Sequence, residues 1–236
     1  MLAESLHHLD GAVNLPYCFR WCPTLVSVDS HPTSDDKVLL AMESAKVAKR
    51  VTIIEDGIGE DLSFNLLAWR GDQLTAVCQL SGSLMNEPPD ARLSRTVEVA
   101  ILCRTGFEAT SLTFVAEGYC ATDPSQIDPS RPLAAQLVEN PAVRECLTIT
   151  HLDGNEARVV SLPYTYEVGR KVKFDTPVEH PSRQTSNKFL TRLLDILASD
   201  VPPAPIDDET WQDVTADQIS ALGFHVHHSI DMDDLP

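Results

Sequence analysis

The spacing of apolar side chains along the chain predicts four helices and six strands. Apolar residues recur at helical spacing after the capping candidates Thr33, Ser34 and Asp35, and alternate or run together where strands are expected. The expected helices are 33–51, 90–106, 133–139 and 186–198. The expected strands are 64–69, 74–80, 110–116, 146–152, 157–166 and 171–174, with glycine-containing turns joining the first two and the fourth to the fifth.

The order of these elements, α-β-β-α-β-α-β-β-β-α, predicts the fold class. It mixes hairpins with helices and lacks a sustained alternation of strand and helix, so a Rossmann-type sheet is disfavoured. We therefore predict an α+β fold with a mixed, largely antiparallel sheet and helices packed on it. The core domain is expected at 33–198, after an irregular N-terminal arm at 1–32 that proline residues interrupt.

The second expected helix, over 90–106, illustrates how a buried face is predicted. Leu93, Val97, Ala100 and Ile101 lie at helical spacing, so we expect them to face the core. Gly106 is expected to end this helix.

The composition changes at residue 199 and predicts an acidic C-terminal extension over 199–236. This segment contains nine acidic residues and no lysine or arginine, and it begins with a proline-containing linker. Thr215 and Gln218 have the spacing of a capping box and Gly223 can end a helix, so a short helix is expected near 215–223.

Apolar side chains accompany this acidic helix and form a candidate partner-binding stripe. They are Trp211, Val214, Ile219, Leu222 and Phe224. Such a stripe has two interpretations: it anchors the segment in a groove on a partner protein, or it folds back and completes the core of its own domain. Both remain open from the sequence.

Composition and charge restrict the classes of partner that we expect. The 236 residues carry a net charge of −17 with 43% apolar content, which is typical of a folded chain whose field repels phosphate backbones. We therefore expect protein partners or self-association and no direct binding of nucleic acid. No run of 18 apolar residues and no signal-peptide pattern occurs, so neither a membrane span nor secretion is expected. The six scattered cysteines are typical of reduced, buried thiols, and the cytoplasm is the expected location.

Basic residues are few and gather in two short clusters. One contains Lys46, Lys49 and Arg50, and the other contains Arg170, Lys171 and Lys173. Charge complementarity alone suggests that these clusters receive the acidic C-terminal segment, within one chain or between neighbouring chains.

Two clusters of side chains are candidates for chemistry. His225 and His227 would point to one side of an extended strand, and with Asp231 they could hold a divalent metal, although a solvated terminus has the same pattern. His151 and Asp153 could form an acid–base pair, although a turn aspartate beside a surface histidine is the simpler interpretation. No phosphate-binding loop, dinucleotide motif or nucleophile motif appears, so no catalytic residues and no other cofactor are expected.

One stretch of the sequence resembles known proteins. Residues 141–175, PAVRECLTITHLDGNEARVVSLPYTYEVGRKVKFD, resemble a segment of uncharacterised proteins of actinobacteria and their phages. The resemblance implies a bacterial or phage origin, with the host cytoplasm as the location of a phage protein, and it implies no activity.

Together these observations favour a non-enzymatic, protein-binding accessory, regulatory or assembly factor that uses an acidic surface and its C-terminal segment. The alternatives are a metal-dependent hydrolase of unfamiliar type and an acidic mimic of nucleic acid that inhibits a DNA-binding protein.

Overall fold

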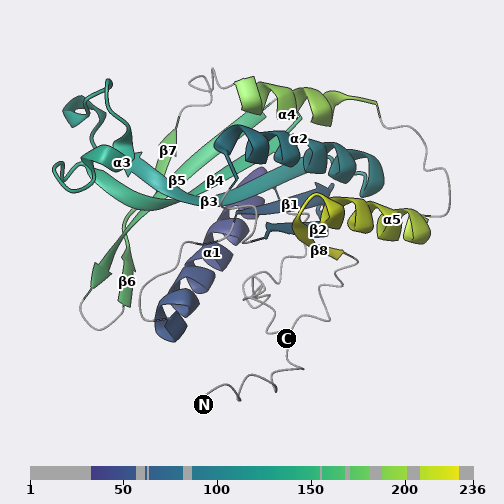
Figure 1. Ribbon diagram of the computed structural model, residues 1–236, viewed down its shortest axis with the longest axis horizontal. Coiled ribbons are helices and arrows are strands. Elements are labelled where there is room, and N and C mark those ends of the chain that lie inside the picture. Colours follow the sequence, from purple (N-terminus) through teal and green to yellow (C-terminus); the bar gives the residue numbers. More distant parts are fainter. Residues whose placement is uncertain are drawn as a thin grey trace, which may run out of the picture.

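The protein has the predicted α+β fold, as the computed structural model in Figure 1 shows. The structure describes residues 33–56, 62, 64–81, 87–154, 156–167, 171–180, 188–200 and 208–228. Within these ranges the helices are α1 (Ser34–Asp56), α2 (Pro89–Gly106), α3 (Leu133–Gln136), α4 (Lys188–Ala198) and α5 (Asp208–Ala221), with a 3-10 turn at Pro124–Gln126. The strands are β1 (Asn65–Arg70), β2 (Gln73–Leu80), β3 (Ser111–Ala121), β4 (Val143–Asp153), β5 (Glu156–Glu167), β6 (Lys171–Phe174), β7 (Val178–His180) and β8 (Phe224–His228).

The eight described strands belong to one antiparallel sheet. Its order is β6-β5-β4-β3-β1-β2-β8, and β7 pairs with β5 beside β6. The predicted hairpins are confirmed, and their turns contain Gly71 at φ 61° and Gly154 at φ 56°, in the left-handed region that glycine adopts most readily. The expected strands did not include β7 and β8, which have three and five residues, although an extended strand at His225 and His227 was considered for the candidate metal site.

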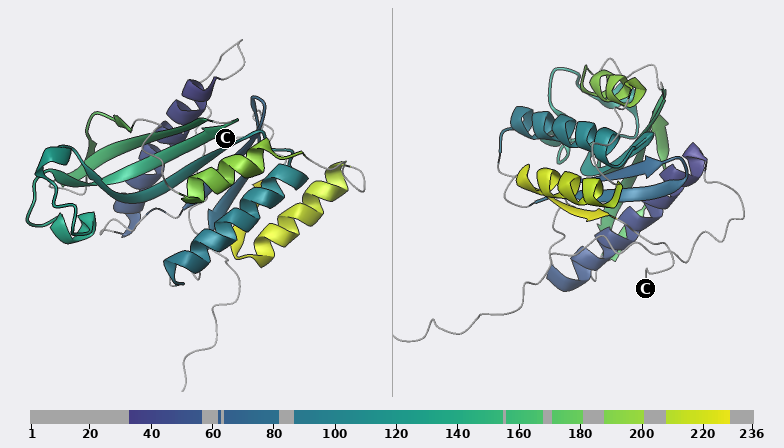
Figure 2. Two further views of the ribbon diagram at one scale, coloured as in Figure 1. Left: turned by 90° about the horizontal axis from the view of Figure 1, so that it is seen from above. Right: turned by 90° about the vertical axis from the view of Figure 1, so that its right-hand side faces the viewer.

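Helices cover both faces of the sheet. Helices α2, α4 and α5 lie side by side on one face, and α1 crosses the other (Figure 2). Because side chains alternate across a strand, each face has its own core. Leu66, Cys78 and Leu112 pack under the three-helix layer, whereas Leu67 and Ile149 pack under α1.

Helix α1 begins as the capping candidates predicted. The backbone N–H of Thr33 donates to the Asp36 carboxylate at 2.8 Å, and the N–H of Asp36 donates to the Thr33 hydroxyl at 3.3 Å. Two otherwise unsatisfied donors of the first turn are thereby bonded reciprocally. The helix continues to Asp56 and carries Lys46, Lys49 and Arg50 in its second half.

The predicted buried face of α2 was partly wrong. Val97 and Ala100 are buried, but Leu93 is 44% exposed and Ile101 is 40% exposed. Val99 and Cys103 are fully buried in their place. The helix has α4 and α5 as neighbours, so its buried arc faces the sheet and these helices together and is not centred where the spacing pattern placed it.

The acidic C-terminal extension joins the sheet and the helical layer of the core. Helix α5 packs beside α2, and β8 pairs with β2 in the register Ala76↔His228 to Leu80↔Phe224. Of the candidate partner-binding stripe, Ile219 and Phe224 are buried in the chain's own core, and Trp211, Val214 and Leu222 are half-buried. Between the two interpretations left open by the sequence, the structure supports docking of this segment on its own domain.

The start of this helix differs from the prediction, and its end agrees. Helix α5 begins at Asp208, so Thr215 lies in the helix interior, where its hydroxyl donates to the carbonyl of Trp211 at 2.8 Å. The capping-box prediction was therefore wrong, because the hydroxyl bonds back into the helix. Gly223 follows the helix at φ 90°, as predicted for the residue that ends it.

None of the described helices is long and apolar enough to cross a membrane.

Candidate functional site

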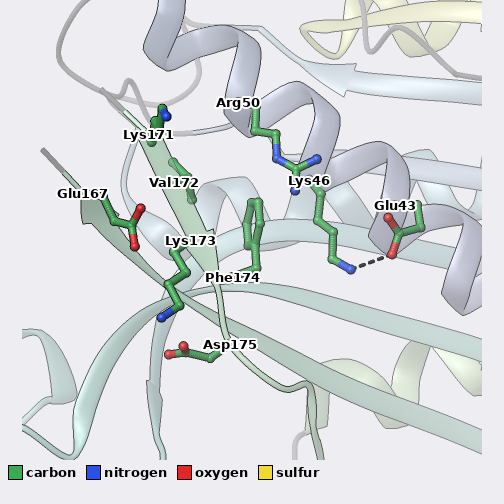
Figure 3. Close-up of a pocket in the computed structure, with 9 residues that line it drawn as sticks. All are labelled: Glu43, Lys46, Arg50, Glu167, Lys171, Val172, Lys173, Phe174 and Asp175. Atoms are coloured by element: carbon green, nitrogen blue, oxygen red, sulfur yellow. Dashed lines mark hydrogen bonds and ion pairs between the residues drawn. The ribbon is translucent and has the colours of Figure 1, made fainter. Parts of the chain in front are cut away.

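A hollow of about 530 Å³ lies between α1 and the edge strand β6. Four cationic side chains line it: Lys46 and Arg50 from α1, and Lys171 and Lys173 from β6 (Figure 3). The structure therefore brings together parts of the two basic clusters that are separate in the sequence. Arg170 lies outside the described residues, and Lys49 is buried elsewhere, as shown below.

The α1 wall of the hollow is held in place by local contacts. Lys46 and Arg50 lie four residues apart, on one side of the helix. The Lys46 ammonium is 2.5 Å from the Glu43 carboxylate, which offsets its charge. The Arg50 guanidinium lies 5.4 Å from the centre of the Phe174 ring, a cation–π contact between α1 and β6.

The β6 wall presents two kinds of side chain in alternation. Lys171 and Lys173 are exposed, whereas Val172 and Phe174 are half-buried against the core under α1. Residues of both faces of the strand line the hollow, so the hollow runs along the strand's outer edge. Within the described part of the chain, β6 pairs with β5 alone, so its outer edge has backbone N–H and C=O groups without a strand partner there.

The charges in the hollow are mixed, but the two lysines of β6 are available. Glu43, Glu167 and Asp175 also line it, and Glu43 is bonded to Lys46. Neither Lys171 nor Lys173 forms an ion pair with another described residue. Lys171 and Lys173 of the edge strand can therefore bind an anionic partner, as can Arg50, whose described contact is with the Phe174 ring.

Lys49, which precedes Arg50 in α1, connects this helix to the sheet. Its ammonium is fully buried and 2.5 Å from the Glu117 carboxylate, which also accepts from the Leu62 backbone N–H at 2.5 Å and from the Tyr164 hydroxyl. The rings of Tyr164 and Tyr166 lie 5.2 and 5.7 Å from the ammonium. Burial disfavours the charged form of Lys49, but Glu117 and Tyr166 outweigh it, so the pKa of Lys49 lies above its usual value. The pair is thus ionised and anchors the α1 wall.

His151 is part of a second buried polar group, and the expectation of a surface histidine was wrong. It is 2% exposed, and its Nδ1 lies 2.8 Å from the Thr113 hydroxyl, which accepts from the Trp69 indole N–H at 3.0 Å. Its Nε2 has no hydrogen-bond partner among the described residues. Burial, and next the charge of Lys37, lower the pKa of His151 to about 4. A neutral imidazole out of reach of solvent cannot serve with Asp153 as an acid–base pair for a substrate.

The terminal histidines lie at the opposite edge of the sheet. Alternation along β8 leaves His225 and His227 exposed on the same side, opposite Gln79 and Val77 of β2. Asp231 lies outside the described residues. No group of three or more His, Cys, Asp or Glu side chains suited to a metal ion occurs among the residues that the structure describes, so the three-ligand metal site stays a prediction.

The described cysteines behave as predicted. Cys78, Cys103, Cys120 and Cys146 are buried and form no disulfide. The sulfur atoms of Cys78 and Cys103 lie 3.8 Å apart, and the contact with Cys78 together with burial raises the pKa of Cys103 well above its usual value.

In comparisons with known proteins, no family model, no curated protein and no solved structure matches this chain.

Proposed function

We propose that this chain is a non-enzymatic protein-binding factor, of the accessory, regulatory or assembly kind, that receives an extended acidic segment of a protein along β6. One observation carries the proposal. In a chain with 18 basic and 35 acidic residues, cationic side chains from two distant segments line one hollow beside a sheet edge with which no other described strand pairs.

The backbone edge of β6 supplies affinity for such a segment, and the alternation of its side chains supplies selectivity. A strand that adds to a sheet edge gains backbone hydrogen bonds, and its alternate side chains contact the alternate side chains of its neighbour. Lys171 and Lys173 favour acidic side chains on one face of such a strand, and Val172 and Phe174 favour apolar side chains on the other.

The net charge of the protein restricts where such a segment binds. The field of a chain with net charge −17 repels acidic segments over most of its surface. Attraction at the two lysines acts over about 8 Å at physiological salt, so it operates only at the hollow. The four described cysteines, which are buried free thiols, are consistent with the cytoplasm as the compartment in which we propose that this binding occurs.

A labelled peptide of alternating glutamate and valine tests the proposal, with fluorescence anisotropy as the readout. We expect saturable binding that weakens as salt is added, because exposed charge pairs are screened. Lys173→Glu should weaken binding by about tenfold or more.

Arg192→Glu is the matched control. Arg192 is exposed on α4, which contributes none of the residues that line the hollow, and its substitution changes the net charge by the same amount. Equal effects of the two substitutions would overturn the proposal, because binding would then follow net charge alone. Displacement of the peptide by a single-stranded oligonucleotide at lower concentration would also overturn it, in favour of a nucleic-acid ligand.

A further inference from the structure

The side-chain pattern of β6 is complementary to that of a segment in the acidic extension. Strand β6 reads Lys-Val-Lys-Phe over 171–174, and residues 230–233 read Ile-Asp-Met-Asp. An antiparallel pairing would place Asp233 opposite Lys171, Met232 opposite Val172, Asp231 opposite Lys173 and Ile230 opposite Phe174. Each charged pair then lies on one face of the sheet, and each apolar pair lies on the α1 face.

We propose that residues 230–233 of a second copy of this chain add as a strand to the outer edge of β6. This inference rests on the proposed function and identifies the acidic segment that the hollow receives. The chain is thus both receptor and ligand, and copies associate by strand addition.

The sheet order requires a second copy. The last described residue of β8 is His228, and the five residues from there to Asp233 can span at most about 18 Å even when fully extended. Strands β6 and β8 are the two ends of the path β6-β5-β4-β3-β1-β2-β8, about 29 Å apart at the usual strand spacing (Figure 1). The segment of one chain therefore cannot reach β6 of the same chain.

The lysines of β6 also disfavour the simplest competing association. Antiparallel pairing of β6 with β6 of another copy would oppose Lys171 with Phe174 and Lys173 with Val172, and a shift by one residue would oppose Lys171 with Lys173. Charged edge residues of this kind disfavour the joining of edges. The same two lysines attract an acidic strand. The proposed contact joins two different surfaces, the edge of β6 and residues 230–233. Two copies can therefore exchange these segments reciprocally in a closed dimer, or further copies can add to form larger assemblies.

Sedimentation velocity of the untagged full chain, from micromolar to millimolar concentration, tests the inference with two charge-reversed variants. One is Lys171→Asp with Lys173→Asp, and the other is Asp231→Lys with Asp233→Lys. We expect the native chain to associate, and each variant alone to associate about tenfold or more weakly, because each then opposes like charges across the contact. An equimolar mixture of the two variants should associate again, since each edge then meets a segment of opposite charge.

The outcomes separate the two proposals. Recovery in the mixture supports the inference and shows that both variants are folded. A native chain that stays monomeric, a variant that associates like the native chain, or a mixture that does not recover would overturn it. If the glutamate–valine peptide still binds in a Lys173-dependent manner in any of these cases, the proposed function stands and only the identity of the occupant is wrong.

Discussion

The buried histidine of β4 predicts a specific acid sensitivity. His151 has a pKa of about 4 in the folded protein, against an ordinary value of about 6.5 in an unfolded chain. Between these two pH values the unfolded chain binds a proton that the folded chain excludes. Lowering the pH through this range therefore favours unfolding, and the contribution of His151 to stability is fully present only above pH 6.5 or so.

The magnitude follows from the size of the shift. At about 1.4 kcal/mol for each pH unit, a displacement of about 2.5 units lowers the free energy of unfolding by about 3 kcal/mol between pH 7 and pH 4. Neighbouring charges also contribute to the shift: Lys37 and Arg158 lower the pKa of the His151 imidazole, and Asp153 raises it. Burial is the largest cause, so salt should change the effect little.

Urea denaturation at a series of pH values measures this contribution when it is compared with His151→Asn. The asparagine side chain can still accept from the Thr113 hydroxyl but has no proton to gain, so its unfolding free energy should fall by about 3 kcal/mol less over the same range. Acidic residues titrate equally in both proteins and cancel in the comparison. Parallel pH curves for the two proteins, or an imidazole that titrates near pH 6.5 by NMR, would refute the reasoning.

Two further sets of substitutions have defined expectations. Gly106→Ala should lower the unfolding free energy by about 1–3 kcal/mol, because the new methyl carbon would lie 2.0 Å from the Thr215 hydroxyl oxygen; Gly118→Ala, with no atom within 4 Å, is the control in urea denaturation. Lys49→Met should cost about 3–5 kcal/mol because it leaves the Glu117 carboxylate buried without its cation. Adding Glu117→Leu to the Lys49→Met variant should recover part of this lost stability. Thermal unfolding of the two single variants and the double variant tests the pairing. If the double variant loses as much stability as the two single variants together, the pairing of Lys49 with Glu117 is contradicted.

The sequence predicted the elements that carry strong local signals. Alternation and the Asp153-Gly154 turn were sufficient for the β4–β5 hairpin, because turn chemistry and period-2 patterning act over a few residues. The start of α5 was misplaced because a hydroxyl and an amide three residues apart, at Thr215 and Gln218, have the spacing of a cap also in a helix interior. Local patterns cannot distinguish a helix start from a helix turn when the preceding residues are also compatible with helix.

The candidate site was visible in the sequence only as separate parts. Lys46 and Lys171 were recognised in two basic clusters, but their meeting depends on the position of β6 at the sheet edge and on the crossing of α1. The different role of Lys49 depends on Glu117, which is 68 positions away and reaches it only through the packing of α1 on β3. No local pattern encodes such pairings.

The position of β8 has a consequence for how the chain reaches its native state. Strand β2 obtains its outer neighbour from residues 224–228, so during synthesis the β1–β2 hairpin keeps an open flank until these residues have been made, about 150 residues later. During that interval the apolar groups around Cys78 and Leu80 are covered by neither α5 nor β8, and nascent chains are then most prone to aggregate. Any shortened version that stops before α5 would keep this flank exposed permanently.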